Sequence, residues 1–342
     1  MLGSGRDRAR HRTGVIVASR NSGAAGRGRR SGAPSSRGAG RTGPVKPAGK
    51  GARNTRRDSE SRGGRPGHPG QPAGRGKGRA TALGSSRDKR SDERDDLGGT
   101  QVEGRQAVRE LLIAGRRRVH EIWIANDRDA SDIVEDIVEL ARANRVPIVE
   151  VSRKKLDYAA RSEAPQGVLA RADALMPVSF DALVKRRPGK PPFLVAMDGV
   201  TDPGNLGAVL RCCDGAGVDG VVLPRHRSVH VTPTVAKASV GACEHVPMAL
   251  VGGLPTALAK MRDVGIWVVG LDDAADKSLF DLGELATEGI CLVMGAEGAG
   301  LSRLVRERCD VIVSIPMRGR LSSLNVSTAA ALATYEVARH RR

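Results

Sequence analysis

Three segments toward the C-terminus combine glycines with amides, hydroxyls and isolated charged side chains, the residue types that bind ligands and move protons. They are DGVTDPGNLGAVLR (198–211), MGAEGAGL (294–301) and SIPMRGRLSSLNVSTA (314–329). Each segment follows an apolar run of strand length. Loops at strand ends that are held by a rigid sheet commonly carry catalytic and binding groups. The three segments therefore predict one site assembled from three loops.

In the first segment, Asn205 and Arg211 are the side chains that could act on a substrate. Pro203 stops the preceding strand, and Gly207 lets the backbone approach a ligand closely. Asn205 and Arg211 are six residues apart, which is not a same-face spacing on a helix, so they can meet only if Asn205 lies in the loop. The alternative is that Asn205 caps a helix expected over residues 206–214 and that Arg211 is a solvated charge.

The second and third segments also allow two interpretations each. In the second, bare glycine backbone surrounds Glu297, which suits a ligand crevice at a strand end but also a helix cap with a spare carboxylate. In the third, Ser323, Leu324 and Asn325 supply a hydroxyl, an apolar group and an amide at the start of an Ala-rich helix expected over residues 323–342. An ordinary cluster of capping residues would look the same.

Six apolar runs predict the strands of an α/β domain around these loops. They are apolar throughout rather than alternating, as expected for parallel strands covered by helices on both faces. The runs are residues 193–197, 220–224, 245–250, 266–271, 290–294 and 311–315. Gly215, Gly217 and Gly220 match the spacing of a dinucleotide-binding fingerprint, but they precede a strand instead of following one, so we expect a turn there.

A smaller α/β domain is predicted before it, with strands at residues 119–125, 146–151 and 167–172 and a helix that begins after Ser131. We place this domain at residues 101–173, a Pro-rich linker at 174–192 and the larger domain at 193–342.

The N-terminal residues 1–97 are predicted to be a disordered basic tail. Residues 1–90 hold 23 of the 56 basic residues but only four of the 38 acidic ones, so the rest of the chain is almost neutral. No aromatic residue precedes Trp123. Such a segment buries too little apolar surface to fold, and its charge attracts polyanions such as RNA.

The remaining composition narrows the class of protein. The five cysteines lack the spacing of a metal site, so we expect reduced thiols and no metal. No apolar run is long enough to span a membrane, and we expect a cytoplasmic protein.

Taken together and in this order, the three segments resemble the motifs of the SpoU/TrmH family of RNA ribose 2′-O-methyltransferases. The pattern DxxxDPxNxGxxxR is matched by residues 198–211, GxExxGL is approximated by 295–301, and IPM…SLNVS is matched by 315–327. The resemblance covers residues 193–340. The smaller domain looks like the family's accessory RNA-binding domain, which is similar to ribosomal protein L30e.

This resemblance implies an α/β fold with a C-terminal trefoil-knotted parallel-sheet (SPOUT) methyltransferase domain, a small N-terminal L30e-like domain and the basic tail. It implies S-adenosylmethionine as cofactor and a homodimer formed through the knotted domain. The cofactor-binding positions carried over are Gly295, Ile315 and Leu324. The catalytic and substrate-positioning set is Asn205, Arg211, Glu297, Ser323 and Asn325.

The implied activity is methylation of a ribose 2′-hydroxyl in RNA, and the two-domain layout points to a guanosine of 23S rRNA. The alternatives are a tRNA substrate, an adenosine of 23S rRNA as in the thiostrepton-resistance enzymes, and a ribosome-binding protein that has kept the fold without catalysis. A guanidinium stays protonated in proteins, so we expect Arg211 to bind phosphate and stabilise a developing alkoxide rather than act as a base. Which group removes the 2′-hydroxyl proton stays open.

Deletion of residues 1–90 is expected to weaken RNA binding and to flatten its salt dependence, because fewer counterions are then released on binding. The slope of log K against log salt concentration should become shallower by about 0.7–0.9 for each phosphate that the protein no longer neutralises. Titrations of labelled RNA at several salt concentrations measure this slope. An unchanged slope in the truncated protein would contradict a role of the tail in RNA binding.

Overall fold

The computed structural model describes residues 96–127, 131–185, 188–226, 229–275 and 277–341. The predicted tail, residues 1–97, therefore lies outside the described residues except for its last two. Leu97 is buried, and its backbone N–H donates to the carbonyl oxygen of Leu175 at 2.8 Å. The packed part of the chain thus already includes Leu97, which the composition had assigned to the tail.

The N-terminal part forms a mixed four-stranded sheet in the order β1-β4-β2-β3. Its strands are β1 (Gln101–Glu103), β2 (Val119–Ala125), β3 (Ile148–Val151) and β4 (Val168–Ala172). Its helices are α1 (Arg105–Ala114), α2 (Asp132–Ala143) and α3 (Arg153–Ala159). β2 and β3 are parallel, whereas β4 runs antiparallel to β1 and β2. The three predicted strands and the helix after Ser131 are confirmed, but the short β1 was not predicted.

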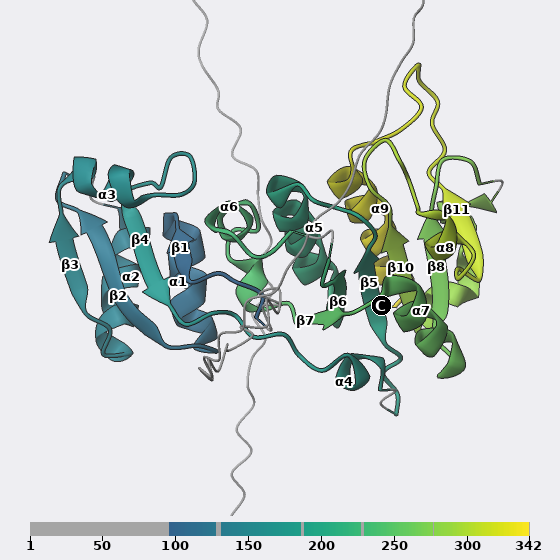
Figure 1. Cartoon of the computed structure of the whole chain (residues 1–342), viewed down its shortest axis with the longest axis horizontal. Helices are drawn as coiled ribbons and strands as arrows, with labels where there is room; N and C mark the ends of the chain where they lie inside the picture. The colour runs from purple at the N-terminus through teal and green to yellow at the C-terminus, as the bar shows by residue number, and fades with distance from the viewer. Residues whose placement is uncertain (1–95, 128–130, 186–187, 227–228, 276, 342) are drawn as a thin grey trace, which may run out of the picture. The chain divides into compact units, whose positions relative to one another are not determined.

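The C-terminal part forms a parallel seven-stranded sheet in the order β7-β6-β5-β10-β8-β11-β9 (Figure 1). Its strands are β5 (Phe193–Met197), β6 (Gly220–Pro224), β7 (Met248–Val251), β8 (Trp267–Leu271), β9 (Lys277–Ser278), β10 (Ile290–Met294) and β11 (Val311–Ser314). Five of the six predicted runs contain one of these strands, and the sixth, 245–250, overlaps β7 but ends one residue before that strand ends. The two-residue edge strand β9 was not predicted.

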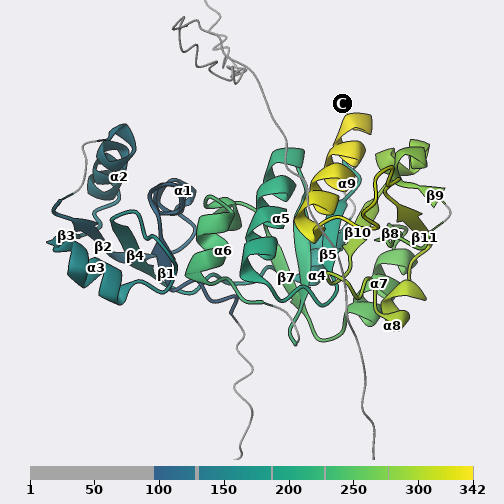
Figure 2. The same cartoon turned by 90° about the horizontal axis from the view of Figure 1, so that it is seen from above.

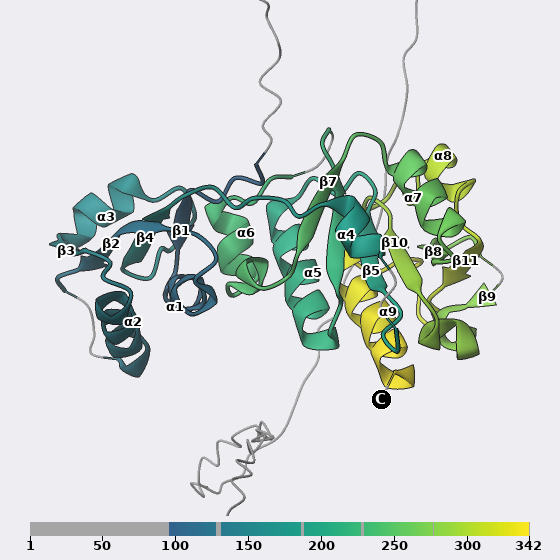
Figure 3. The same ribbon diagram turned by 90° about the horizontal axis from the view of Figure 1, so that it is seen from below.

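Helices cover both faces of this sheet, as the apolar character of the strands predicted (Figures 2 and 3). One face carries α5 (Pro203–Ala216), α6 (Pro233–Ala238) and α9 (Val326–His340). The other carries α4 (Phe180–Val184), α7 (Leu254–Asp263) and α8 (Arg303–Arg306). Within β5, Phe193, Val195 and Met197 belong to the core shared with α5 and α9, while Leu194 and Ala196 belong to the core shared with α7. Short 3-10 helices span Ala242–Glu244, Leu279–Asp281 and Gly283–Thr287.

Helix α5 begins earlier than predicted. Asp202 is its N-cap, and the Asp202 side chain accepts a hydrogen bond from the backbone N–H of Asn205 at 2.7 Å, while Pro203 occupies the first turn. The helix ends at Gly217, which has a positive φ of 73°. The Gly215–Gly220 spacing is therefore a helix end followed by a strand, as we predicted, and not a dinucleotide loop.

The state of the cysteines and the length of the helices can be compared with the predictions about metal sites and membrane-spanning segments. All five cysteines are free, and burial raises the pKa of the Cys243 thiol to about 12, so this thiol is protonated at neutral pH. No group of three metal-ligating side chains occurs among the described residues. No helix in the same part of the chain is long and apolar enough to cross a membrane.

Gly207 sets how closely α5 and α6 can pack. A Cβ added there would lie 2.6 Å from the Cβ of Ala238 and 2.8 Å from the carbonyl oxygen of Val235, closer than real contacts allow. Gly207→Ala is expected to lower the free energy of unfolding by about 1–3 kcal/mol, because this overpacking outweighs the better helix propensity of alanine.

Urea denaturation followed by circular dichroism measures this change. Gly252→Ala is the matched control, since an added Cβ at that exposed glycine meets no atom within 4 Å. Equal denaturation midpoints for Gly207→Ala and the control would mean that α5 and α6 do not depend on this close approach.

Candidate functional site

The three predicted loops leave the same edge of the seven-stranded sheet, because parallel strands end on one side. β5 and β10 are neighbours in register, with Met197 opposite Met294, and the N–H of Asp198 donates to the carbonyl oxygen of Met294 at 2.8 Å. Only β8 separates β10 from β11. Segments about a hundred residues apart in sequence therefore meet at one place.

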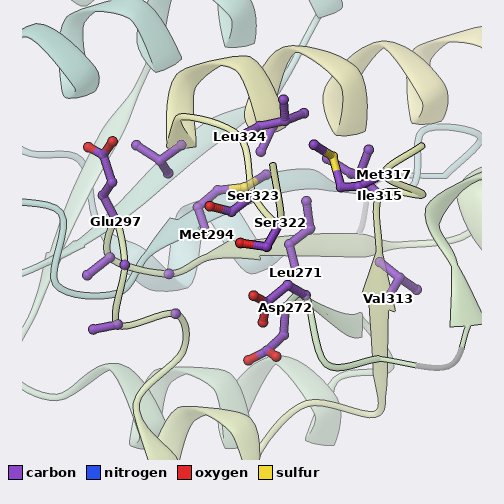
Figure 4. A pocket seen from close by; sticks show the side chains of 18 residues that line it. Leu271, Asp272, Met294, Glu297, Val313, Ile315, Met317, Ser322, Ser323 and Leu324 are labelled. Carbon is purple, nitrogen blue, oxygen red and sulfur yellow. The ribbon is translucent and has the colours of Figure 1, made fainter. Parts of the chain in front are cut away.

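A cavity of about 430 Å³ lies beside this meeting point, lined by the second and third predicted loops and by the end of β8 but by no residue of the first loop (Figure 4). Figure 4 shows Glu297 at one side and Met317 at the other, with Asp272 and Ser322 between them. The lining comes from the ends of β8, β10 and β11, the loops that follow them, and the start of α9. These residues are Leu271, Asp272, Asp273, Met294, Gly295, Ala296, Glu297, Gly298, Ala299, Gly300, Val313, Ile315, Met317, Ser322, Ser323, Leu324, Val326 and Ala329.

The glycine-rich loop after β10 folds back on itself at the wall of this cavity. Ala296 and Gly300 exchange two backbone hydrogen bonds, of 3.0 and 2.9 Å. Gly298 and Gly300 have positive φ values of 76° and 64°, which glycine adopts without strain. A Cβ added at Gly295 would lie 2.4 Å from the carbonyl carbon of Gly300. Only glycine at position 295 allows the two arms of the turn to approach so closely.

Two carboxylates tie the end of this loop to neighbouring strand ends. Asp198, directly after β5, accepts a hydrogen bond from the N–H of Ser302, which is the N-cap of α8, at 2.7 Å. Asp272, directly after β8, forms an ion pair with Arg306 of α8 at 2.6 Å. Partial burial alone would raise the pKa of Asp272, but the hydrogen bonds from Arg306 and from the N–H of Ala274 outweigh it and hold that pKa below its ordinary value.

Three of the predicted site residues form a hydrogen-bonded chain beside the cavity. The Asn325 Oδ1 accepts from the N–H and the hydroxyl of Ser327, which leaves its Nδ2 to donate to the Oδ1 of Asn205 at 2.9 Å. The Nδ2 of Asn205 then donates to the Oε2 of Glu297 at 3.3 Å. The orientation of each amide is thus determined by the next partner, and the chain joins all three loops.

This row of hydrogen bonds decides between two of the alternatives left open by the sequence. Asn205 is not the cap of α5; it lies in the first turn of that helix and presents its side chain to the other loops. Asn325, by contrast, is the cap of α9, which begins at Val326 and not at residue 323. The side-chain Oδ1 of Asn325 caps the helix, while its Nδ2 donates to Asn205. One side chain therefore both caps α9 and helps to form the site.

The side chain of Arg211 takes no part in these hydrogen bonds. It is exposed on α5, and among the described residues no hydrogen bond or ion pair is seen for its side chain. Asn205 lies inside the helix, so the six-residue spacing places the two side chains on different faces, as predicted for that case. The guanidinium of Arg211 is therefore open to an anion from outside the protein.

The residues assigned to the cofactor by the resemblance, Gly295, Ile315 and Leu324, all line the cavity. Glu297 and Ser323 line it too, whereas Asn205 and Asn325 adjoin it through Glu297. Leu271, Asp272 and Asp273, at the end of β8, also line the cavity and were not predicted as site residues. Because β8 was predicted as a strand, the two aspartates at its end could have been expected at the same edge of the sheet, but they belong to none of the three motifs.

Two arginines of the basic run at residues 116–118 bind partners within the protein. The Arg117 side chain is only 5% exposed and forms an ion pair with the buried Glu244 at 2.5 Å, and Arg116 donates to the carbonyl oxygen of Glu244 at 3.0 Å. Arg318 and Arg320, in the loop before α9, are exposed close to the cavity. The basic run at residues 116–118 is thus largely structural, while the loop keeps its charges toward solvent.

Family models match almost the whole described chain. The model described as SpoU rRNA Methylase family matches residues 192–335, and the one described as RNA 2′-O ribose methyltransferase substrate binding matches residues 101–178. The two matches follow the two sheets of the structure.

Similar proteins cover the same region. The 23S rRNA (guanosine-2′-O-)-methyltransferase RlmB of Shewanella oneidensis is 42% identical over 245 residues, which are 70% of this chain and 96% of that protein. RlmB of Pseudomonas aeruginosa is 41% identical over 244 residues, with the same coverage. Among solved structures, the SpoU methyltransferase AviRb from Streptomyces viridochromogenes, in complex with the cofactor AdoMet, has a TM-score of 0.59 and 29% identity over 70% of this chain and 89% of that one.

Gly295→Ala is expected to open the loop after β10. The added methyl group would collide with Gly300, so the two backbone hydrogen bonds between Ala296 and Gly300 should break. Hydrogen exchange of these two amides, followed by mass spectrometry of the peptide that contains them, should speed up by about tenfold or more, the equivalent of roughly 1.4 kcal/mol.

Gly319→Ala is the matched control, because an added Cβ there meets no atom within 4 Å. Unchanged exchange in Gly295→Ala would show that the loop does not rely on the close approach at this position.

Proposed function

Because the chain belongs to the SpoU rRNA methylase family, we propose that it transfers the methyl group of S-adenosylmethionine to a ribose 2′-hydroxyl of RNA. The proposed substrate is a guanosine of 23S rRNA, the substrate that the names of the RlmB relatives give. The observation that carries the proposal is the convergence of Gly295, Ile315 and Leu324 on one cavity beside the chain of Asn325, Asn205 and Glu297.

The cavity has the chemistry to hold this cofactor. Leu271, Val313 and Leu324 offer apolar walls for a purine ring, and the bare backbone around Gly295 offers N–H and C=O groups for polar edges. Asp273 is exposed in the lining, so a carboxylate is available for ribose hydroxyls or an ammonium group. When bound, S-adenosylmethionine supplies an electrophilic methyl group on a sulfonium.

We assign positioning roles to the amide chain. Asn205 and Asn325 hold each other and Glu297 in one arrangement, so little reorganisation is required when the ribose binds beside them. Ser323, exposed in the cavity lining, offers a hydroxyl to the same ribose or to its phosphate. Alignment of the 2′-hydroxyl with the methyl group supplies a large share of the rate in a displacement of this kind.

Arg211 receives a separate role because it lies outside the amide chain. Its exposed guanidinium binds a phosphate of the target nucleotide and stabilises the oxygen that loses its proton. It does not act as the base, since a guanidinium remains protonated in proteins. Glu297 holds Asn205 rather than Arg211.

The remaining architecture is proposed on the same basis. Residues 101–173 act as an RNA-binding domain similar to ribosomal protein L30e, joined by the 174–192 linker to the catalytic domain, which is threaded as a trefoil knot. The strand order supports threading, because β10 lies between β5 and β8 although it follows both in the chain.

The catalytic domain is proposed to pair with a second copy in a homodimer. The exposed side chains of Leu332 and Tyr335 on α9 offer apolar surface for this contact. A cytoplasmic location stays a prediction.

The direct test is to map 2′-O-methylation across rRNA and tRNA in cells with and without the gene. The proposal expects loss of one methyl group at a guanosine of 23S rRNA and its return on complementation. Loss confined to tRNA, or to an adenosine, would contradict the proposed substrate. No loss at any ribose would favour a binding protein without catalysis.

Complementation with Arg211 variants tests the proposed role of that residue. Methylation rates are expected to fall about tenfold in Arg211→Lys, which keeps the charge without the planar fork, and about a hundredfold in Arg211→Ala. Arg303→Lys is the matched control, since Arg303 is an exposed arginine paired with Glu307 outside the cavity. Near-wild-type rates in Arg211→Lys would refute the requirement for a fork.

A further inference from the structure

Tyr158, on helix α3 of the N-terminal domain, is 94% exposed. The chain has only two tyrosines, two tryptophans and three phenylalanines, and the other exposed aromatic side chains are at most about half exposed. A ring that packs so little against the protein adds almost nothing to the stability of the fold, since apolar stabilisation scales with the area removed from water. The ring is therefore available to a partner, and the charges around it indicate of what kind.

Exposed cationic side chains lie near this ring in the chain. Lys154 lies four residues before Tyr158, one helical turn away, and is exposed, as is Arg161 just after the helix. Neither forms an ion pair with another of the described residues. Asp157 is the single carboxylate within α3; of the three basic residues before it, Arg153 is paired with Asp127 at 3.1 Å, which leaves Lys154 and Lys155. The surface around Tyr158 is therefore positive and suits an anionic partner.

A second pair of cations borders this surface. Lys155 and Arg171 both lie over the ring of Trp123, with Lys155 Nζ at 4.9 Å and the guanidinium carbon of Arg171 at 4.8 Å from the ring centroid. Trp123 is thus occupied by cations of the protein itself, while Tyr158 has both ring faces open to solvent.

The surface is also held in place before any partner binds. The buried carboxylate of Glu103 accepts hydrogen bonds from the N–H groups of Arg161 and Ser162, at 2.7 and 3.0 Å, and this fixes the segment that follows the helix. Ser152 caps the start of α3, and Leu156 anchors it in the core at 0% exposure. A preformed surface loses little conformational entropy when it binds a ligand.

We propose that Tyr158 is a stacking platform for an unpaired RNA base, with Lys154 and Arg161 binding the adjoining phosphates. This inference rests on the proposed RNA substrate and specifies which part of it the N-terminal domain reads. An open aromatic ring beside cations fits a base and its backbone, whereas the bases of a duplex present their edges and not their faces. A protein partner would require a larger apolar area than one ring surrounded by charges.

The test compares the full-length protein with three variants at one position: Tyr158→Phe, Tyr158→Leu and Tyr158→Ala. The probes are a labelled RNA stem-loop with 2-aminopurine in its unpaired loop and a blunt duplex of the same stem. Tyr158→Ala is expected to bind the stem-loop roughly 5- to 100-fold more weakly, the range for removal of one stacked base, with duplex binding unchanged. Quenching of 2-aminopurine on binding should persist in Tyr158→Phe and disappear in Tyr158→Leu and Tyr158→Ala.

The leucine variant separates stacking from plain apolar packing. Wild-type affinity of Tyr158→Leu for the stem-loop would overturn the proposal, as would equal weakening on stem-loop and duplex in Tyr158→Ala. Lys154→Ala should lower the salt slope of binding by about 0.7–0.9, the value for one neutralised phosphate. If the wild-type protein methylates rRNA and Tyr158→Ala binds the stem-loop normally, only the proposed role of Tyr158 is refuted. If the wild-type protein binds neither the stem-loop nor the duplex, the proposed function is contradicted as well.

Discussion

The parallel pairing of β10 with β5 on one side and β8 on the other is the constraint on which the site depends. All five residues of β10 are buried, and their register places Met294 beside Met197. The loops after β5, β8 and β10 must therefore be neighbours. Asp198 and Asp272 use this closeness to hold helix α8 from two strand ends. A one-residue slip of β10 would turn its side chains to the opposite faces and separate these groups.

The site has few polar side chains, and several of them also stabilise the local fold. Asn325 caps α9 and orients Asn205, which in turn holds Glu297. Helix capping and site assembly are therefore not competing explanations of these residues. Because the amides are already oriented by the fold, they need not reorganise during the reaction, which is the usual source of electrostatic stabilisation in enzymes. Arg211 remains outside this network, and its exposure suits a role that begins only when RNA binds.

Much of this could be predicted from the sequence, for identifiable reasons. Apolar runs located all the main strands of the larger sheet, and the motif loops were placed correctly at their ends. Strand order could not be predicted, because the pairing of β10 between two earlier strands depends on contacts far apart in the chain. The predicted starts of α5 and α9 were displaced because Asp202 rather than Asn205 caps α5, and because Asn325 caps α9, which was predicted to begin at residue 323. The ion pair of Arg117 with Glu244 could not be predicted either, because the local sequence shows only a basic run and the partner is 127 residues away.

The cavity at the ends of β8, β10 and β11 is the proposed binding site of the methyl donor. Calorimetric titration of the full-length protein with S-adenosylmethionine tests this proposal without knowledge of the RNA substrate. We expect saturable binding with one site per chain, and a negative heat-capacity change because apolar walls such as Leu271 and Leu324 are removed from water. S-adenosylhomocysteine should compete for the same site. The absence of saturable binding by a folded protein would contradict the proposed cofactor site.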